Sequence, residues 1–94
     1  MGAVVKADIK FYDGSHLSIS EHVELGANRQ IERKFYKFHY QATDGTLIFR
    51  YDNVPHYRHL STFPAHKHTR DDVIEAGSPD LTDVLQEVDD LLYS

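Results

Sequence analysis

The segment IERKFYKFHYQATDGTLIFRYDN, residues 31–53, decides the fold because two alternating runs flank a turn signal in it. We predict strands over residues 31–42 and 46–53, joined by a two-residue turn at Asp44-Gly45, a pair typical of tight β-hairpins. Successive side chains of a strand point to opposite faces of the sheet. The segment therefore predicts an antiparallel hairpin with one aromatic face and one polar face.

The turn fixes which residues of this hairpin lie opposite each other. On the aromatic face the predicted pairs are Tyr40–Phe49, Phe38–Tyr51 and Ala42–Leu47. On the other face they are His39–Arg50 and Lys37–Asp52, so that face is cationic and titratable. The aromatic side chains of the segment are assigned to the core as a group: Phe35, Tyr36, Phe38, Tyr40, Phe49 and Tyr51.

A hairpin precedes this segment and an amphipathic helix follows it. Residues 5–11 and 17–25 alternate, and a three-residue loop over residues 13–15 predicts the pairs Phe11–Leu17, Ile9–Ile19 and Val5–Val23. Ser78-Pro79-Asp80 predicts a helix over residues 78–93 with Ser78 as its N-cap. The helix carries one apolar stripe, which should cover the sheet: Leu81, Val84, Leu85, Val88, Leu91 and Leu92.

These segments predict one α+β domain over residues 1–94. Its four-stranded antiparallel sheet consists of two hairpins, and one C-terminal amphipathic helix packs on the apolar face. Residues 54–77 are predicted as a long histidine-rich loop because Pro55 and Pro64 interrupt strand pairing, although Val73-Ile74 could add a short strand. Loops of this length in small domains are often functional.

Charge is distributed unevenly along the chain, whose net charge is −5. Residues 29–70 hold eight basic residues, three acids and five of the seven histidines, whereas residues 71–94 hold eight acids and no Lys or Arg. The basic centre suits phosphate, and the acidic tail could shield it or bind a basic partner; the alternative is that acids and bases pair across the fold. The chain has no cysteine, no secretory signal and no membrane-length apolar run, which predicts a cytoplasmic location.

The densest group of reactive side chains lies between residues 50 and 68 and suits RNA cleavage without a metal ion or other cofactor. Such cleavage needs a base for the 2′-hydroxyl proton and an acid for the leaving 5′-oxygen, and histidine serves as either near neutral pH. Arginine binds phosphate oxygens. The candidate catalytic residues are His66, His68, His39, His56, Arg50 and Asp52, with His66 and His68 as the acid–base pair and His39 or His56 as substitute. The candidate substrate-binding residues are Lys37, Asn53, Tyr57, Arg58 and Lys67.

Two other interpretations of the same histidines remain open. In an extended segment His66 and His68 point to the same side and could bind zinc, nickel or copper, with His56, His59 or Asp52 completing the site. The metal ligands predicted for this interpretation are His56, His66 and His68. Alternatively, the histidines are structural or bind a protein partner, which makes the chain a non-enzymatic binding module.

The chain resembles the TumE family of small bacterial and archaeal proteins, described as toxin components of toxin–antitoxin pairs. The resemblance is carried by Arg50-Tyr51-Asp52-Asn53, Pro55-His56, Phe63-Pro64 and His66-Lys67-His68, and it spans most of the chain. It implies a partner, an antitoxin with a helix-turn-helix domain that neutralises the toxin and represses the operon. Architectural similarity to small toxin ribonucleases favours RNA as the target.

Overall fold

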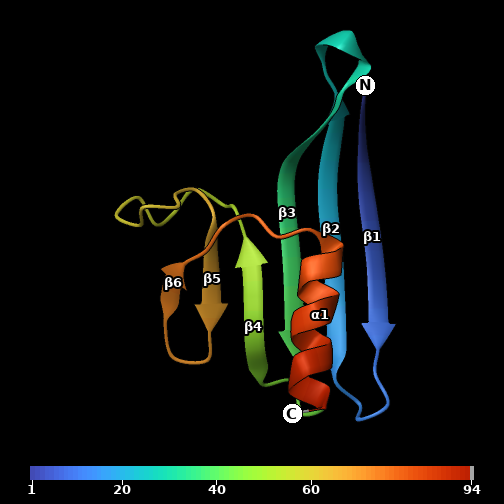
Figure 1. Ribbon diagram of the computed structural model, residues 1–94, viewed down its shortest axis with the longest axis vertical. Helices are drawn as coiled ribbons and strands as arrows, with labels where there is room; N and C mark the ends of the chain where they lie inside the picture. Colours follow the sequence, from blue (N-terminus) through green and yellow to red (C-terminus); the bar gives the residue numbers. More distant parts are fainter. Residues whose placement is uncertain (94) are drawn as a thin grey trace.

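The protein's structure, a computed structural model, describes residues 1–93. Its strands form one antiparallel sheet in the order of the chain, and a single helix crosses one face of it (Figure 1). The strands are β1 (Gly2–Lys10), β2 (His16–Leu25), β3 (Ile31–Gln41), β4 (Leu47–Asp52), β5 (His66–Thr69) and β6 (Val73–Glu75). A 3₁₀ turn η1 (Ala27–Arg29) joins β2 to β3, and the helix is α1 (Leu81–Leu92).

The prediction of a four-stranded sheet is wrong, because the sheet has six strands. Both extra strands lie in the segment predicted as a loop, although β6 coincides with the short strand suggested at Val73-Ile74. The β5 segment His-Lys-His-Thr contains no apolar residue, so alternation does not reveal it. Pairing with β4 on one side and β6 on the other makes it a strand.

The first hairpin is shifted by two residues from the predicted register. Ile9 lies opposite Leu17, not Ile19, and the N–H of Phe11 donates to the carbonyl of Ser15 over 2.9 Å. The loop is therefore residues 12–14, and its third residue, Gly14, has φ = 85°. Three-residue hairpin loops place a left-handed residue at this position, and glycine adopts that conformation without strain. A shift by two residues keeps each side chain on its predicted face.

The second hairpin confirms four of the predicted pairs: Tyr40–Phe49, Phe38–Tyr51, His39–Arg50 and Lys37–Asp52. The pair Ala42–Leu47 is wrong, because Leu47 lies opposite Gln41 and the register shifts between Tyr40 and Gln41. The loop again has three residues, 43–45, and ends in a glycine of positive φ, Gly45 at 89°. The same turn chemistry therefore explains both register errors.

The helix begins later than predicted, with Asp80 rather than Ser78 as its N-cap. The Asp80 carboxylate accepts the N–H of Asp83 over 2.8 Å, and the Asp83 carboxylate accepts the N–H of Asp80 over 3.1 Å. This reciprocal capping box satisfies two N–H groups that a helix start otherwise leaves unbonded. Ser78 instead receives the phenol O–H of Tyr36 over 3.0 Å and holds the connecting segment against β3.

The core lies between the helix and one face of the sheet, as predicted. Val84 and Val88 are fully buried and pack against the sheet residues Leu17, Ile19, Tyr36, Phe38, Tyr40 and Phe49. Burying one such side chain contributes about 1.5–3 kcal/mol. Phe35 is an exception to the aromatic assignment, because it points to the opposite face and is 53% exposed.

Polar contacts join the helix to β4 and β5 at the side of this core. The Tyr51 hydroxyl donates to Glu87 Oε1 over 2.5 Å, and Lys67 Nζ donates to Glu87 Oε2 over 2.7 Å. Burial lowers the pKa of Lys67, but its bonds to Glu87 and Tyr51 outweigh this and raise it. Among the described residues, no helix has the length and apolarity needed to cross a membrane.

Candidate catalytic site on the polar face

Two rows of side chains run across β3, β4 and β5 on the face opposite the helix. The strand register aligns His39, Arg50 and His68 in one row, and Lys37, Asp52 and His66 in the next. Neighbouring strands lie about 4.8 Å apart, so the imidazoles of the first row flank the guanidinium of Arg50. The register thus gathers side chains from two hairpins that are far apart in the sequence.

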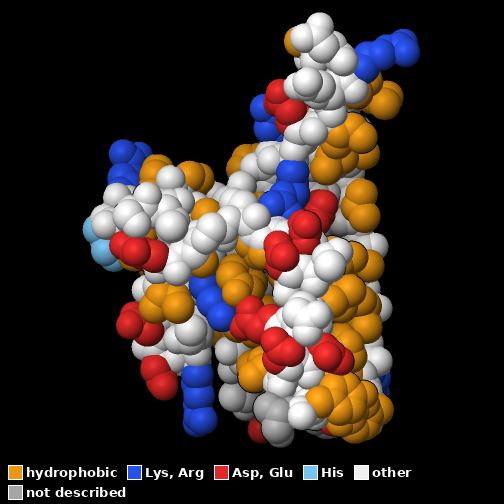
Figure 2. Space-filling view, in the orientation of Figure 1, with side chains coloured by type: hydrophobic (Ala, Val, Ile, Leu, Met, Phe, Trp, Pro, Cys, Tyr) orange, Lys and Arg blue, Asp and Glu red, His pale blue; other side chains and the backbone are white. Residues whose placement is uncertain are grey.

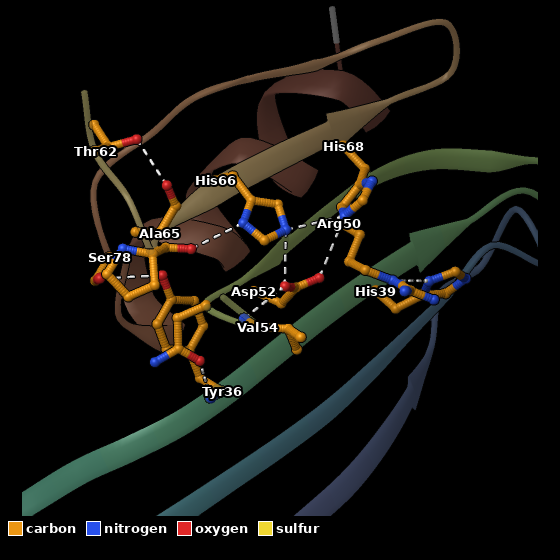
Figure 3. A network of polar contacts seen from close by, with 12 residues as sticks. Tyr36, His39, Arg50, Asp52, Val54, Thr62, Ala65, His66, His68 and Ser78 are labelled. Carbon is orange, nitrogen blue, oxygen red and sulfur yellow. Dashed lines mark hydrogen bonds and ion pairs between the residues drawn. The ribbon is translucent and has the colours of Figure 1, made fainter. Parts of the chain in front are cut away.

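Asp52 is the centre of the second row and is 4% exposed. Its Oδ1 accepts the N–H of Val54 over 3.1 Å and lies 2.8 Å from His66 Nε2, while its Oδ2 lies 3.4 Å from His68 Nε2 (Figure 3). One carboxylate therefore contacts both imidazoles of β5. A buried carboxylate needs such partners, because an unpaired charge in the interior is costly.

The hydrogen bonds of His66 restrict its protonation. Its Nδ1 lies 2.9 Å from the carbonyl of Pro64, which only accepts, so Nδ1 carries a proton. Its Nε2 faces the Asp52 carboxylate and, at 3.1 Å, the Nε2 of His68. The geometry therefore fits either an imidazolium that donates through both nitrogens or a neutral ring whose Nε2 lone pair faces a cation. The side chain is 1% exposed, so it acts on other groups of the site and not directly on a large substrate.

His68 is the imidazole of β5 that reaches the surface, with a side chain 22% exposed. Burial lowers its pKa, the Asp52 carboxylate opposes this, and the charges of His66 and Arg50 lower it further. The ring of Tyr57 packs edge-on against both imidazoles, with its centroid 4.7 Å from that of His66 and 5.7 Å from that of His68. Tyr57 thus packs against both imidazoles while the side chain of His68 stays partly exposed.

His39 flanks Arg50 on its other side. The Nε–H of Arg50 donates to His39 Nδ1 over 3.1 Å, so His39 Nε2 carries the proton of the neutral ring and faces Gln41 Oε1 at 3.1 Å. Burial and the positive charge of Arg50 lower the pKa of His39. His39 thereby orients the Arg50 side chain on one side, and His68 lies next to it on the other.

Several predicted site residues lie away from these rows. His56 and Arg58 are exposed in the β4–β5 connection, and Arg58 lies 6.0 Å from the ring centre of Phe63. Asn53 joins β4 to β3, because its amide accepts the N–H of Tyr36 and donates to the carbonyl of Lys34. Lys67 points to the helix face, where it pairs with Glu87. The structure therefore does not place Lys67 on the face that carries Arg50.

Two groups of the site were missed by sequence reasoning. Gln41 orients His39, and its spacing of two residues along a strand already places both on one face. The Pro64 carbonyl orients His66, for which the sequence carries no signal because the contact is with the backbone.

A shallow groove continues the polar face beside Lys37. It is lined by Ser20, His22, Phe35, Tyr36, Lys37 and Val54. The exposed ring of Phe35 and the cation of Lys37 give this groove an aromatic and a positively charged wall. Such a combination suits the bases and phosphates of a single-stranded nucleic acid.

Acidic side chains gather on the opposite side of the molecule. Figure 2 shows red carboxylates over the helix. One carboxylate of the helix, that of Glu87, pairs with Lys67. The exposed acids of the helix, Asp83, Asp89 and Asp90, lie on the side of the sheet that the helix covers, so they do not shield the His39–Arg50–His68 row on the other side. Glu75 of the same acidic tail, however, lies opposite His66 and therefore on the polar face beside the site.

The same cluster also has the composition of a metal site. Asp52, His66 and His68 each offer one ligand atom, and these atoms lie within 4.8 Å of one another. His56, part of the metal set expected from sequence, is not in this group, and Asp52 takes its place. Two imidazoles and one carboxylate form a donor set that zinc and other divalent transition metals accept.

Comparison with known proteins identifies a family. Neither the curated proteins nor the solved structures returned a match. A family model described as Toxin TumE matches residues 1–92, which include both rows of the polar face and the helix. A toxin family implies an antitoxin partner. Since the match covers nearly the whole chain, the protein belongs to the TumE toxin family.

Proposed function

We propose that this toxin cleaves RNA at the His39–Arg50–His68 row by acid–base catalysis without a metal ion. The observation that carries the proposal is the alignment of two imidazoles on either side of one guanidinium, on an open face of the sheet. Arg50 binds the scissile phosphate and His68 removes the proton of the 2′-hydroxyl. His39 takes up a proton on Nδ1 when Arg50 turns its Nε–H to the phosphate, and this imidazolium protonates the leaving 5′-oxygen.

The second row positions the first. Asp52 contacts both His66 and His68, so its carboxylate stabilises a proton that arrives on His68 during the reaction. His66, hydrogen-bonded to the Pro64 carbonyl, holds Asp52 in place. This assignment replaces His66 by His39 in the acid–base pair, because His66 is buried whereas His39 is half-exposed.

The groove beside Lys37 binds the neighbouring nucleotides in this proposal. Lys37 lies in the row next to Arg50, and Phe35 is exposed further along β3, so a single strand can follow β3 from the phosphate site to the aromatic ring. Stacking on an aromatic ring contributes about 1–3 kcal/mol per base. The partner that we propose is an antitoxin with a helix-turn-helix domain.

The test is cleavage of cellular RNA by the purified protein in EDTA. His68→Ala, His39→Ala and Arg50→Ala should each abolish cleavage, whereas the matched control His59→Ala, an exposed histidine of the β4–β5 connection outside the rows and the groove, should keep it. Co-expression with the gene of a neighbouring helix-turn-helix protein should relieve growth inhibition by the toxin. Absence of both cleavage and growth inhibition would count decisively against the proposal.

The convergence of three ligand atoms favours a second candidate function, metal binding at Asp52, His66 and His68. A neutral His66 with its proton on Nδ1 presents the Nε2 lone pair to the carboxylate, an arrangement that a bound cation would stabilise. Metal analysis of protein purified without a histidine tag decides between the two. Stoichiometric metal that is lost in Asp52→Asn supports binding, whereas metal-free protein that cleaves RNA in EDTA supports the acid–base mechanism.

A further inference from the structure

The two edges of the sheet differ in how well they are protected against pairing with another strand. The β6 edge has only three residues, and short edge strands resist such pairing. The β1 edge has nine residues, contains no proline, and pairs with β2 without any register shift along its whole length. A long, regular edge strand presents a row of hydrogen-bonding groups to solvent.

The backbone groups that β1 presents outward can be identified from its pairing with β2. The N–H of Phe11 donates to Ser15, and the carbonyl of Met1 accepts the N–H of Leu25. Odd-numbered residues therefore bond to β2, because hydrogen-bonded pairs alternate along an antiparallel ladder. The even-numbered residues direct their N–H and C=O groups away from the sheet: Gly2, Val4, Lys6, Asp8 and Lys10.

We propose that β1 pairs antiparallel with β1 of a second copy of the chain, about a twofold axis at Ala7. Pairing through the free groups requires even-numbered residues to lie opposite even-numbered residues. About Ala7, Lys6 of each copy lies opposite Asp8 of the other, which makes two opposite-charge pairs. An axis at Lys6 or at Asp8 places like charges opposite each other, which destabilises a sheet. An axis at Ile9 would also place Asp8 opposite Lys10, but only residues 8–10 of the two strands would then overlap, so charge and overlap together select the axis at Ala7.

The apolar side of β1 favours the same register. About Ala7, Val5 of one copy lies opposite Ile9 of the other, and Ala3 lies opposite Phe11. Val5 is 52% exposed in the single chain, and Figure 2 shows hydrophobic side chains along this flank beside the helix. Pairing would remove part of this apolar surface from water, which contributes about 25 cal/mol per Å².

The dimer joins two six-stranded sheets and keeps both polar faces on the same side, because the twofold axis is perpendicular to the sheet. The two His39–Arg50–His68 rows would then lie on one continuous surface. The inference rests on the edge strand alone and does not depend on the proposed function.

Charge reversal tests the register by sedimentation analysis across a concentration series. Lys6→Asp and Asp8→Lys each turn both attractive pairs into repulsive ones, so each should weaken dimerisation about tenfold or more. Mixing the two variants places Asp opposite Lys in both pairs, so the mixture should form heterodimers. A Lys6→Asp/Asp8→Lys double variant should dimerise as the original chain does. Circular dichroism of each variant checks that the sheet is intact.

A cysteine cross-link gives an independent test, because the chain contains no cysteine. In the proposed register the Ala7 residues of the two copies face each other across a non-hydrogen-bonded pair, about 4.5 Å apart. Ala7→Cys should therefore form an intermolecular disulfide on mild oxidation. Val5→Cys should not, because Val5 of one copy lies opposite Ile9 of the other, four residues along the strand from the second Val5. A monomer at all concentrations, or single charge variants that dimerise unchanged, would overturn the inference. So would a dimer that Val5→Cys links as readily as Ala7→Cys.

Discussion

Replacing Asp52 by asparagine should destabilise the protein strongly. The substitution keeps the size of the side chain and an oxygen that can accept the N–H of Val54, but it removes the negative charge. That charge lies 2.8 Å from His66 Nε2, and the two side chains are 5% and 1% exposed. The change therefore isolates the contribution of the buried carboxylate–imidazole contact between β4 and β5.

The expected loss of stability depends on which hydrogen bonds the buried His66 keeps in the variant. Removing one partner of a buried pair costs about 3–5 kcal/mol when the remaining charge stays in place. The asparagine oxygen in the place of Oδ1 can still accept hydrogen bonds from Val54 and from His66 Nε2, while the amide nitrogen in the place of Oδ2 faces His68 Nε2. These remaining contacts limit the loss to about 2–3 kcal/mol, near the cost of leaving a buried polar group poorly bonded. For a domain of this size the melting temperature should fall by roughly 10–20 °C.

Urea unfolding followed by circular dichroism at pH 7 measures the effect. The matched control is His16→Gln, which breaks an exposed carboxylate–histidine pair of 3.3 Å with Asp8, where the side chains are 36% and 71% exposed. Exposed pairs contribute about 0–1 kcal/mol, so this control should stay close to the original protein. An Asp52→Asn variant as stable as the His16→Gln control would refute the reasoning, because it would show that the buried contact carries no charge interaction.

Three further predictions concern other parts of the molecule. Cleavage of RNA should be fastest below pH 6.5, because the pKa of His39 is lowered from that value and the acid is lost as pH rises; an alkaline optimum in a pH–rate profile would contradict this. Glu87→Gln should lower the free energy of unfolding by about 1 kcal/mol, since its partly exposed ion pair on the helix face is lost, and should leave cleavage within about twofold. Gly45→Ala should lower the free energy of unfolding by about 1–2 kcal/mol, because Gly45 has a positive φ. Gly14→Ala should lower it further, because the added Cβ would also lie 2.4 Å from a threonine hydroxyl. Thermal melts that rank the two variants the other way would contradict this account of the two turns.

The sequence predicts those parts of the fold that depend on local pattern. Alternation predicts β1 to β4 and their faces, and the apolar stripe predicts that α1 covers the sheet. Both errors of register come from the position of a glycine in its turn, since a positive φ at Gly14 and Gly45 requires loops that end on these residues. A rule that places the glycine last in a three-residue loop would have corrected both hairpins.

Only part of the site can be predicted from the sequence, because its assembly also depends on strand register. The pair His39–Arg50 lies within one hairpin, so the turn determines it, and His66 and His68 share a face because they are two residues apart. The contact of Asp52 with His66 depends on the pairing of β4 with β5, across the irregular segment of residues 53–65. No local pattern determines the register after such a connection, so the positions of His66 and His68 in the two rows could not be derived from the sequence.

The helix supplies the missing constraint on that register. Lys67 lies between the two histidines, so it must point to the face that they do not occupy. On that face its ammonium meets Glu87 over 2.7 Å and lies 5.0 Å from the ring centre of Tyr51. A slip of β5 by one residue would bring Lys67 beside Arg50 and place both imidazoles under an acidic helix. The ion pair with Glu87 therefore favours the one arrangement in which His66 and His68 reach Asp52, and the helix helps to build a site on the face that it does not touch.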